Sequence, residues 1–501
     1  MKAQLRSLAS DTIVYGVSTI IGRFLTFLLT PLYTNYVTKS ELGDTAYLYS
    51  LIAFVGIVYS CGFDSAFFRF FSVESAEGGE QRGAETPSER NRSVFAHSFM
   101  GVAVVGVGGT CLICLAPSAL AGALALEAAG IILVYAALIM LFDALALVPF
   151  AALRMESRAR RFALLKLAII AVNVTANLYF VVIERMGIRG IFLSGLLSSF
   201  AGFVLVTPEI ARYMLGGKIA FDAALFRELW RFGLPTVPAA FSAIMLQVAD
   251  RPILKIFVDS AALGLYQANY RLGIPMMMAV TVFEYAWKPF YLRETARRLR
   301  SKAERKARSA MLASALTYFV VAGALVFLSG ALLMEYVVRV PFVGGRFVNP
   351  AYWSGLSIVP IVMGAYFFNG LSVNFSAGVY IRKRTRYLPA ITGSAALANI
   401  ALNFALAPIW GIWGAAWATL GAYMVLAALM YRVSRRLYPL QYEWGRVALA
   451  VGACLFLYVA AVFTTSGMSA QAGAVVRFAW ICAYPLALAA FGFFERAGNH
   501  P

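Results

Sequence analysis

The chain has 501 residues, of which 61% are apolar and 13% are charged, and its formal net charge is +19. Ordinary soluble domains are about 45–50% apolar and about 25% charged, so this composition argues against a water-soluble enzyme, a disordered chain or a disulfide scaffold. The basic residues lie between apolar runs, so membrane topology explains the charge and no nucleic-acid partner is expected. We therefore predict an all-α polytopic membrane protein.

Fourteen segments are long and apolar enough to cross a bilayer, since about 20 apolar residues span its hydrocarbon. They must be helices, because lipid cannot satisfy open backbone groups. In chain order these segments are 11–37, 43–71, 93–116, 127–153, 161–183, 190–211, 228–257, 263–291, 309–333, 352–380, 387–408, 411–431, 447–464 and 474–494.

The distribution of basic residues predicts the orientation of these spans. With the N-terminus placed in the cytoplasm, cytoplasmic segments hold 29 of the 43 Lys and Arg residues and outer loops hold 5. By the positive-inside rule, both termini are predicted to be cytoplasmic. The segment 293–308 alone carries eight basic residues, and we expect it to lie against the anionic lipids of the inner leaflet.

The chain contains an internal repeat with an offset of 221 residues. The segment from Pro31 to Leu42-Gly43 matches the segment from Pro252 to Leu263-Gly264 in spacing. The later motifs Asn173-x-x-x-Asn177 and Gly187-x-x-Gly190 match Asn399-x-x-x-Asn403 and Gly411-x-x-Gly414.

The repeat predicts two parallel six-helix lobes followed by an appended helix pair. We place the lobes at 1–215 and 216–434, and helices 13 and 14 at 435–501. Six helices is an even number, so both lobes point the same way, as in transporters whose substrate path lies between two halves.

Four segments carry a resemblance to a known family. They are TPLYTNYVTKSELG (30–43), GFDSAFFRFF (62–71), the stretch RFGLPTVPAAF…YRLG (231–273) and ANIALNFALAPIWGIWGAAWATLG (398–421). Together they resemble the Wzx-like polysaccharide and O-antigen flippases of the multidrug/oligosaccharidyl-lipid/polysaccharide exporter superfamily.

The resemblance implies a function without covalent chemistry. Such proteins move undecaprenyl-diphosphate-linked oligosaccharide from the inner to the outer leaflet of the bacterial cytoplasmic membrane. We accordingly expect no enzyme activity, no cofactor and no bound metal, with Na⁺ or H⁺ as the candidate coupling ion. A lipid-linked oligosaccharide is the expected substrate, and the polysaccharide polymerase machinery is a further candidate partner.

Two arginines are the main candidates for contact with the substrate. Ionisable residues within spans are costly and usually face a cavity or a partner. Arg23 lies near the middle of the first span, and Arg271 lies well inside the eighth, beside Tyr270. The family resemblance implies that spans one, two, seven and eight line the cleft. Because an Arg fork matches phosphate oxygens, these two could clamp a diphosphate, with Arg251 as a third candidate.

Other ionisable residues suggest gates, coupling or simple anchoring. Asp250 could pair with Arg251 or Lys255 in a gate, and Asp64 and Arg69 are a second candidate pair. Two acids within spans, Asp143 and Glu284, could bind a coupling ion or serve as partners for basic residues. Basic residues near the predicted span ends can extend to the interface instead; these are Arg69, Lys166, Arg231, Lys288 and Arg477.

Alternatives from the same superfamily remain open. A lipid II flippase shares the expected fold, and a cation-coupled multidrug antiporter would need a mostly acidic cavity, against which the central arginines argue. A polysaccharide polymerase or ligase would carry a large outer loop, and the outer loop expected here, 334–351, is short.

Overall fold

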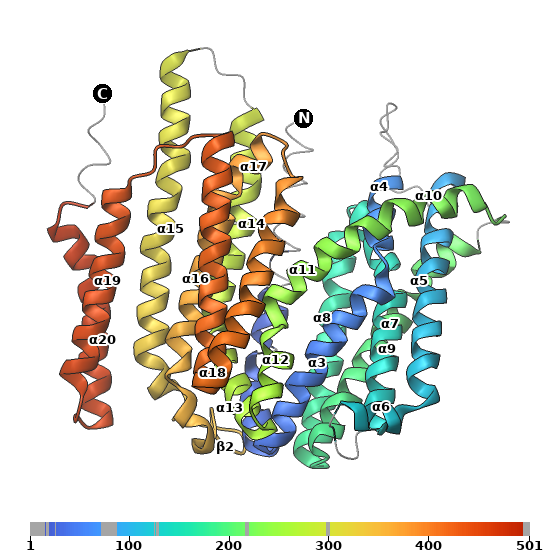
Figure 1. Cartoon of the computed structure of the whole chain (residues 1–501), viewed down its shortest axis with the longest axis horizontal. Helices are drawn as coiled ribbons and strands as arrows, with labels where there is room; N and C mark the ends of the chain where they lie inside the picture. Colours follow the sequence, from blue (N-terminus) through green and yellow to red (C-terminus); the bar gives the residue numbers. More distant parts are fainter. Residues whose placement is uncertain are drawn as a thin grey trace. The chain divides into compact units, whose positions relative to one another are not determined.

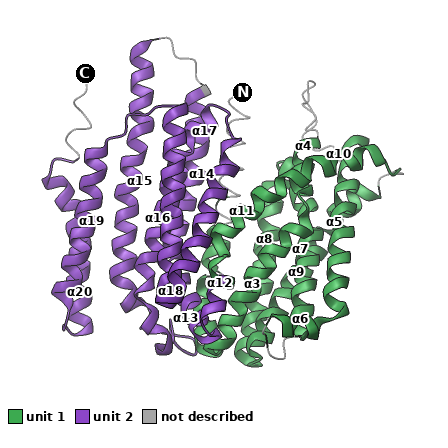
Figure 2. Ribbon diagram, viewed as in Figure 1, with its two compact units in different colours: residues 1–252 green, residues 253–501 purple. Residues whose placement is uncertain are grey.

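The structure is a computed structural model that describes residues 16, 20–25, 27–71, 88–124, 126, 130–215, 220–296 and 301–493. It divides into two compact units, Met1–Pro252 and Ile253–Pro501 (Figure 2). Each unit contains helices that are long and apolar enough to cross a membrane, which confirms the predicted all-α polytopic class.

Several elements of unit 1 follow one another directly as segments of one interrupted helix (Figure 1). In its described part, unit 1 contains twelve elements. They are α2 (Thr30–Tyr36), α3 (Lys39–Ser60), α4 (Phe63–Phe70), α5 (Glu89–Leu115), α6 (Pro117–Ala123), α7 (Gly130–Met155), α8 (Ala159–Asn177), the π-helix η1 (Leu178–Ile183), α9 (Gly187–Met214), α10 (Ala223–Gly233), the 3₁₀ helix η2 (Leu234–Thr236) and α11 (Val237–Val248). The next helix, α12 (Asp250–Phe257), crosses the boundary between the units.

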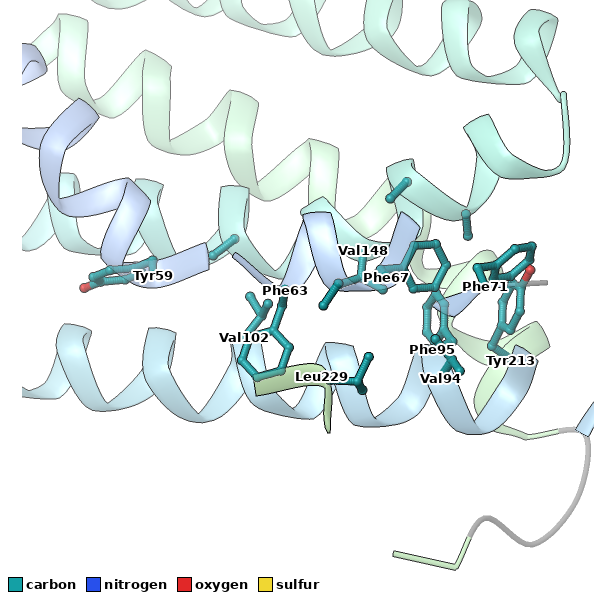
Figure 3. Packing of buried hydrophobic residues seen from close by; sticks show 14 of the residues in the cluster. Tyr59, Phe63, Phe67, Phe71, Val94, Phe95, Val102, Val148, Tyr213 and Leu229 are labelled. Atoms are coloured by element: carbon teal, nitrogen blue, oxygen red, sulfur yellow. The ribbon is translucent and has the colours of Figure 1, made fainter. Parts of the chain in front are cut away.

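The core of unit 1 forms where α7 packs against α3, α5 and α9. At one end of it, aromatic residues interlock (Figure 3). The Phe95 ring stacks on Tyr213 with centroids 4.3 Å apart, and the Phe67 ring meets Phe95 edge-on at 6.2 Å. The segment FDSAFF places Phe63 and Phe67 one turn apart, so the short helix α4 presents one aromatic face to α5 and α10.

Unit 2 contains the remaining helices and one small hairpin. They are α13 (Ser260–Arg271), α14 (Ile274–Ala296), α15 (Lys302–Val337), β1 (Pro341–Phe342), β2 (Gly345–Arg346), the 3₁₀ helix η3 (Pro350–Gly355), α16 (Ile358–Phe375), α17 (Ala377–Ile381), α18 (Tyr387–Leu437), α19 (Trp444–Thr465) and α20 (Ala470–Ala490). Its centre is α16, which packs against α14, α15 and α18, and the strands pair antiparallel with Pro341 opposite Arg346.

The last two helices, α19 and α20, pack on each other and on α15. Arg477 of α20 donates from Nη1 to Glu335 Oε2 at 2.8 Å and from Nε to Thr465 Oγ1 at 3.0 Å. Nearer the other end, Thr317 of α15 donates to Glu443 Oε2 at 2.8 Å, and Arg446 pairs with the same carboxylate at 3.0 Å. Polar contacts near both ends of the helix pair α19 and α20 thus attach it to α15.

The two copies of the sequence repeat adopt the same local structures. Thr38 caps α3 by accepting from Glu41 N at 3.2 Å, and 221 residues later Asp259 caps α13 by accepting from Ala262 N at 2.8 Å. The second Asn of each pair donates from Nδ2 to the carbonyl of the first, at 2.9 Å in both copies.

The paired glycines make the same sharp turn in each copy. Gly187 and Gly411 have φ of +57° and +54°, a backbone conformation in which a side chain is strained. Three residues on, a Cβ at Gly190 would lie 2.9 Å from Phe180 O, and one at Gly414 would lie 2.2 Å from Leu406 O. The chain therefore folds back closely enough that only glycine fits.

The structure describes eleven helices that meet the length and composition of a membrane span. The predicted spans 387–408 and 411–431 are two helices that meet at a non-helical turn at Gly411, and the element α18 comprises both. The predicted span 263–291 is broken at Leu272-Gly273 into α13 and α14, and much of the predicted span 11–37 lies outside the described residues. The count of fourteen stays a prediction.

The predicted lobe boundaries also stay a prediction. The compact units divide within α12, because α10 and α11 pack on α4, α5 and α3 of unit 1.

We expect Gly414→Ala to destabilise the protein by about 1–3 kcal/mol, because the new methyl group meets a backbone carbonyl that cannot move aside. Gly452→Ala is the matched control, since its Cβ would enter open space in α19 and should be neutral or stabilising by about 0.5–1 kcal/mol. Thermal melting in detergent measures both; equal melting temperatures would contradict the close approach.

Candidate functional site

The candidate substrate-binding arginines lie in different units. Arg23 lies half-buried in the helical segment 20–25 of unit 1, where a Cβ at Gly22 would lie 3.0 Å from the Ile170 side chain of α8. Arg271 lies half-buried at the last residue of α13 in unit 2. A clamp formed by the two arginines therefore stays a prediction.

The break in the eighth span holds Arg271 in place. Its neighbour Tyr270 contacts Tyr266 and Tyr366, with ring centroids 5.5 Å and 6.0 Å away. One residue further back, Asn269 donates to Tyr352 O at 2.9 Å, which ties α13 to η3. The guanidinium stands at a helix C-terminus, where the helix dipole favours a positive charge.

Arg251 and Asp250 form a buried ion pair. Arg251 Nη1 lies 2.7 Å from Asp250 Oδ1 and also donates to Gln247 O at 2.7 Å. Lys255, the other partner considered for Asp250, donates to the Ser260 hydroxyl. The contacts of Arg251 are those of a structural ion pair, and its expected roles in substrate binding and gating stay predictions.

Asp64 and Arg69 lie at opposite ends of α4, the first half-buried and the second exposed. Five residues on a helix correspond to about 140° around its axis, so the two side chains leave different faces. Their part in a gate stays a prediction.

Asp143 lies near the middle of α7 beside a basic residue. Ser199 of α9 and Lys166 of α8 are the groups near enough to influence its carboxylate. The Lys166 ammonium lies 4.0 Å from the centroid of the Phe150 ring, which stabilises the charge. Asp143 itself is exposed, and among the described residues no basic side chain lies within 4.0 Å of its carboxylate, so its roles as a coupling site or as the partner of a basic residue stay predictions.

Glu284 lies at a pocket in unit 2 with a volume of about 220 Å³. We call this the α14 pocket. Glu284 and Lys288 are exposed at its edge, whereas Trp287, Tyr291 and Ser372 are buried. The residues that line it are Glu284, Trp287, Lys288, Tyr291, Ser372, Val373, Ser376, Tyr380, Leu388, Thr392, Leu426 and Met430.

Several polar contacts of the structure had no counterpart in the sequence analysis. Lys166, Lys288 and Arg477 were expected only to reach the interface, yet Lys288 lies 4.9 Å from the Tyr380 ring and Arg477 binds Glu335. At the end of α7 and α9, Glu156 and Glu209 share a set of arginines: Arg158, Arg161 and Arg212. Of these pairs, Arg212–Glu156 and Arg161–Glu209 join residues far apart in sequence, and nothing local in the sequence signals their pairing.

The sequence matches the model of one protein family, described as "Polysaccharide biosynthesis protein", over residues 8–293. A comparison with curated proteins gives no match.

Solved transporters have a similar fold. One is the lipid II flippase MurJ in an inward closed conformation, with a TM-score of 0.74 and 14% identity, covering 97% of this chain and 100% of that chain. Another is an inward-facing multidrug resistance MATE family transporter of the MOP superfamily, with a TM-score of 0.59 and 15% identity over 85% of this chain and 97% of that one. At these identities the likeness shows the fold alone.

If Lys166 depends on the charge of Asp143, Asp143→Asn should destabilise the protein by up to about 2.5–3.5 kcal/mol, the cost of one unpaired charge at the centre of a span. If Asp143 serves as the partner of Lys166, the double variant Asp143→Asn/Lys166→Met should regain most of that stability and support transport. Chemical unfolding in detergent and a cellular transport assay measure the two effects. A folded double variant without transport would instead point to a coupling role for Asp143.

Proposed function

The chain belongs to the polysaccharide biosynthesis protein family, and from this premise we propose that it is a flippase that moves an undecaprenyl-diphosphate-linked oligosaccharide from the cytoplasmic to the outer leaflet by alternating access. The observation that carries the proposal is the family match over residues 8–293. The fold, which is similar to that of a lipid II flippase, supports it.

The intramembrane cations suit an anionic head group. Arg23 and Arg271 are both half-buried and both lie on spans that the family resemblance assigns to the cleft. A diphosphate leaving water needs charged donors, and a guanidinium fork supplies two parallel hydrogen bonds to phosphate oxygens. A cationic drug would be repelled by the same residues, which favours the flippase over the multidrug antiporter.

The membrane potential supports export without an obligatory coupling ion. Moving negative charge outward across an inside-negative membrane gains about 2.3 kcal/mol per charge per 100 mV. A diphosphate carries more than one such charge, so Na⁺ or H⁺ coupling is optional in this mechanism. If an ion takes part, Glu284 and Asp143 are the acids proposed to carry it.

The substrate class can be tested by ligand-induced stabilisation. We expect an undecaprenyl-diphosphate sugar at about 100 times its Kd to stabilise the purified protein by about 2.7 kcal/mol, because it binds only the folded state. Lipid II and a cationic drug are the comparators. Stabilisation by the drug alone would favour the antiporter, and stabilisation by lipid II alone would favour a lipid II flippase.

We expect Arg23→Ala and Arg271→Ala each to weaken binding of the lipid about 10- to 100-fold, since a charged hydrogen bond contributes about 1.5–3 kcal/mol. Lysine at either position keeps the charge but loses the forked guanidinium, so its affinity for the lipid should lie between those of the wild type and the alanine variant. Arg231→Ala is the control, because Arg231 is exposed on α10. Wild-type levels of surface polysaccharide in both alanine variants would rule out the clamp.

We further propose that the protein lies in the cytoplasmic membrane with both termini inside, and that its basic segment 293–308 faces anionic lipids. In a cysteine-free background, Ser466→Cys, in the turn between α19 and α20, should react with a membrane-impermeant maleimide in intact cells. Thr385→Cys, in the turn before α18, should react only after permeabilisation. Labelling of Thr385→Cys in intact cells, with Ser466→Cys labelled only after permeabilisation, would show the opposite orientation.

A further inference from the structure

The α14 pocket carries two opposite charges that do not neutralise each other. Glu284 and Lys288 are one helical turn apart and both are exposed at its edge. In the part of the chain that the structure describes, neither has an oppositely charged side chain within 4.0 Å. Lys288 lies 4.9 Å from the Tyr380 ring, and among the described residues neither charge is paired by an ion pair, so a ligand that binds both would stabilise the site.

The hydroxyl groups around the pocket present acceptors. Ser372 donates to Asn369 O and Ser376 donates to Val373 O, both at 2.7 Å. With their protons engaged, the two serine oxygens offer lone pairs, and the Glu284 carboxylate adds more. Lys288 supplies donors at the same edge. The ideal ligand therefore donates several hydrogen bonds and accepts at least one.

The floor of the pocket is aromatic and rigid. Trp287 donates from Nε1 to Asn374 O at 3.3 Å, and its ring stacks on Phe283 and Phe290 with centroids 5.8 Å away. Tyr291 meets the same indole edge-on at 5.4 Å. Such a floor suits a ligand that has C–H groups on one face and polar groups at its edge.

These features select among ligand classes. A simple cation would be attracted by Glu284 but repelled by Lys288. A phosphate would be attracted by Lys288 but repelled by Glu284. A neutral polyol can donate to the carboxylate and accept from the ammonium. The volume of about 220 Å³ is close to that of seven liquid waters and below the roughly 300–1,000 Å³ of drug-sized sites, so it fits a single ring.

We propose that the α14 pocket binds one sugar ring of the transported oligosaccharide, with Glu284 accepting from its hydroxyl groups and Lys288 donating to an oxygen. This inference rests on the flippase function proposed above and deepens it. Arg271 lies 13 residues before Glu284 along the same broken span, and 13 residues of a continuous helix would extend roughly 20 Å. A diphosphate near Arg271 would thus leave the attached sugars within reach of the pocket.

The test titrates methyl hexosides and methyl N-acetylhexosaminides into the full-length protein in detergent, with binding followed by saturation-transfer NMR. A ligand of about a dozen heavy atoms at ordinary ligand efficiency should bind with a Kd of about 1 mM. We expect at least one sugar to saturate, and Glu284→Gln and Lys288→Met each to weaken it about tenfold, since one charged hydrogen bond is lost.

Glu228→Gln is the matched control, because Glu228 is exposed on α10 in unit 1. Melting temperatures verify that each variant is folded. No saturable sugar, or equal binding by the Glu284 and Glu228 variants, would overturn the pocket assignment. A further outcome would also overturn the sugar site. If no sugar binds, and NaCl raises the melting temperature more than choline chloride does only when Glu284 is present, the α14 pocket is a cation site.

Failure of this inference is distinguishable from failure of the flippase function. The undecaprenyl-diphosphate sugar is tested on the same preparation, and its binding depends on Arg23 and Arg271 rather than on the pocket alone. Lipid binding that persists while no free sugar binds would overturn the pocket only. If neither the undecaprenyl-diphosphate sugar nor a free sugar binds, the proposed flippase function is overturned as well.

Discussion

The absence of water from the hydrocarbon core is the constraint on which this structure depends. Backbone groups inside the bilayer must be paired within helices, and charges must find partners or face a polar space. Asp250 pairs with its neighbour Arg251, and Glu335 of α15 pairs with Arg477 of α20. The second pair joins two helices, so the requirement to pair charges also affects how helices pack.

Irregular backbone appears at repeated places. The turns at Gly187 and Gly411, and the caps at Thr38 and Asp259, interrupt the helices at matching positions of the two copies. The copies differ elsewhere. In the first, the Tyr33 hydroxyl donates to Asn177 Oδ1 at 2.9 Å, whereas the residue 221 positions after Tyr33 is Leu254. In the described part of the chain, the matching Asn403 Oδ1 is buried without a donor, so the two copies of the repeat differ at this contact.

Polar groups that structural pairing does not absorb are the natural places for substrate. In unit 2, Glu284 and Lys288 are such groups, and both line the α14 pocket on the eighth span. A lipid-linked sugar has an anionic part, a neutral polyol part and an apolar tail. The eighth span offers a cation, Arg271, suited to the first part and a mixed-charge pocket suited to the second.

The sequence by itself determined the all-α membrane class, the repeat and the polysaccharide biosynthesis family, because hydropathy, spacing and local motifs are properties of contiguous residues. Its paired glycines also marked where the chain turns back. Only the tertiary structure decided that Arg477 binds Glu335 and that four helical segments line the α14 pocket. Those outcomes depend on which helix faces pack together, and the charge of Arg477 does not reveal a partner 142 residues away.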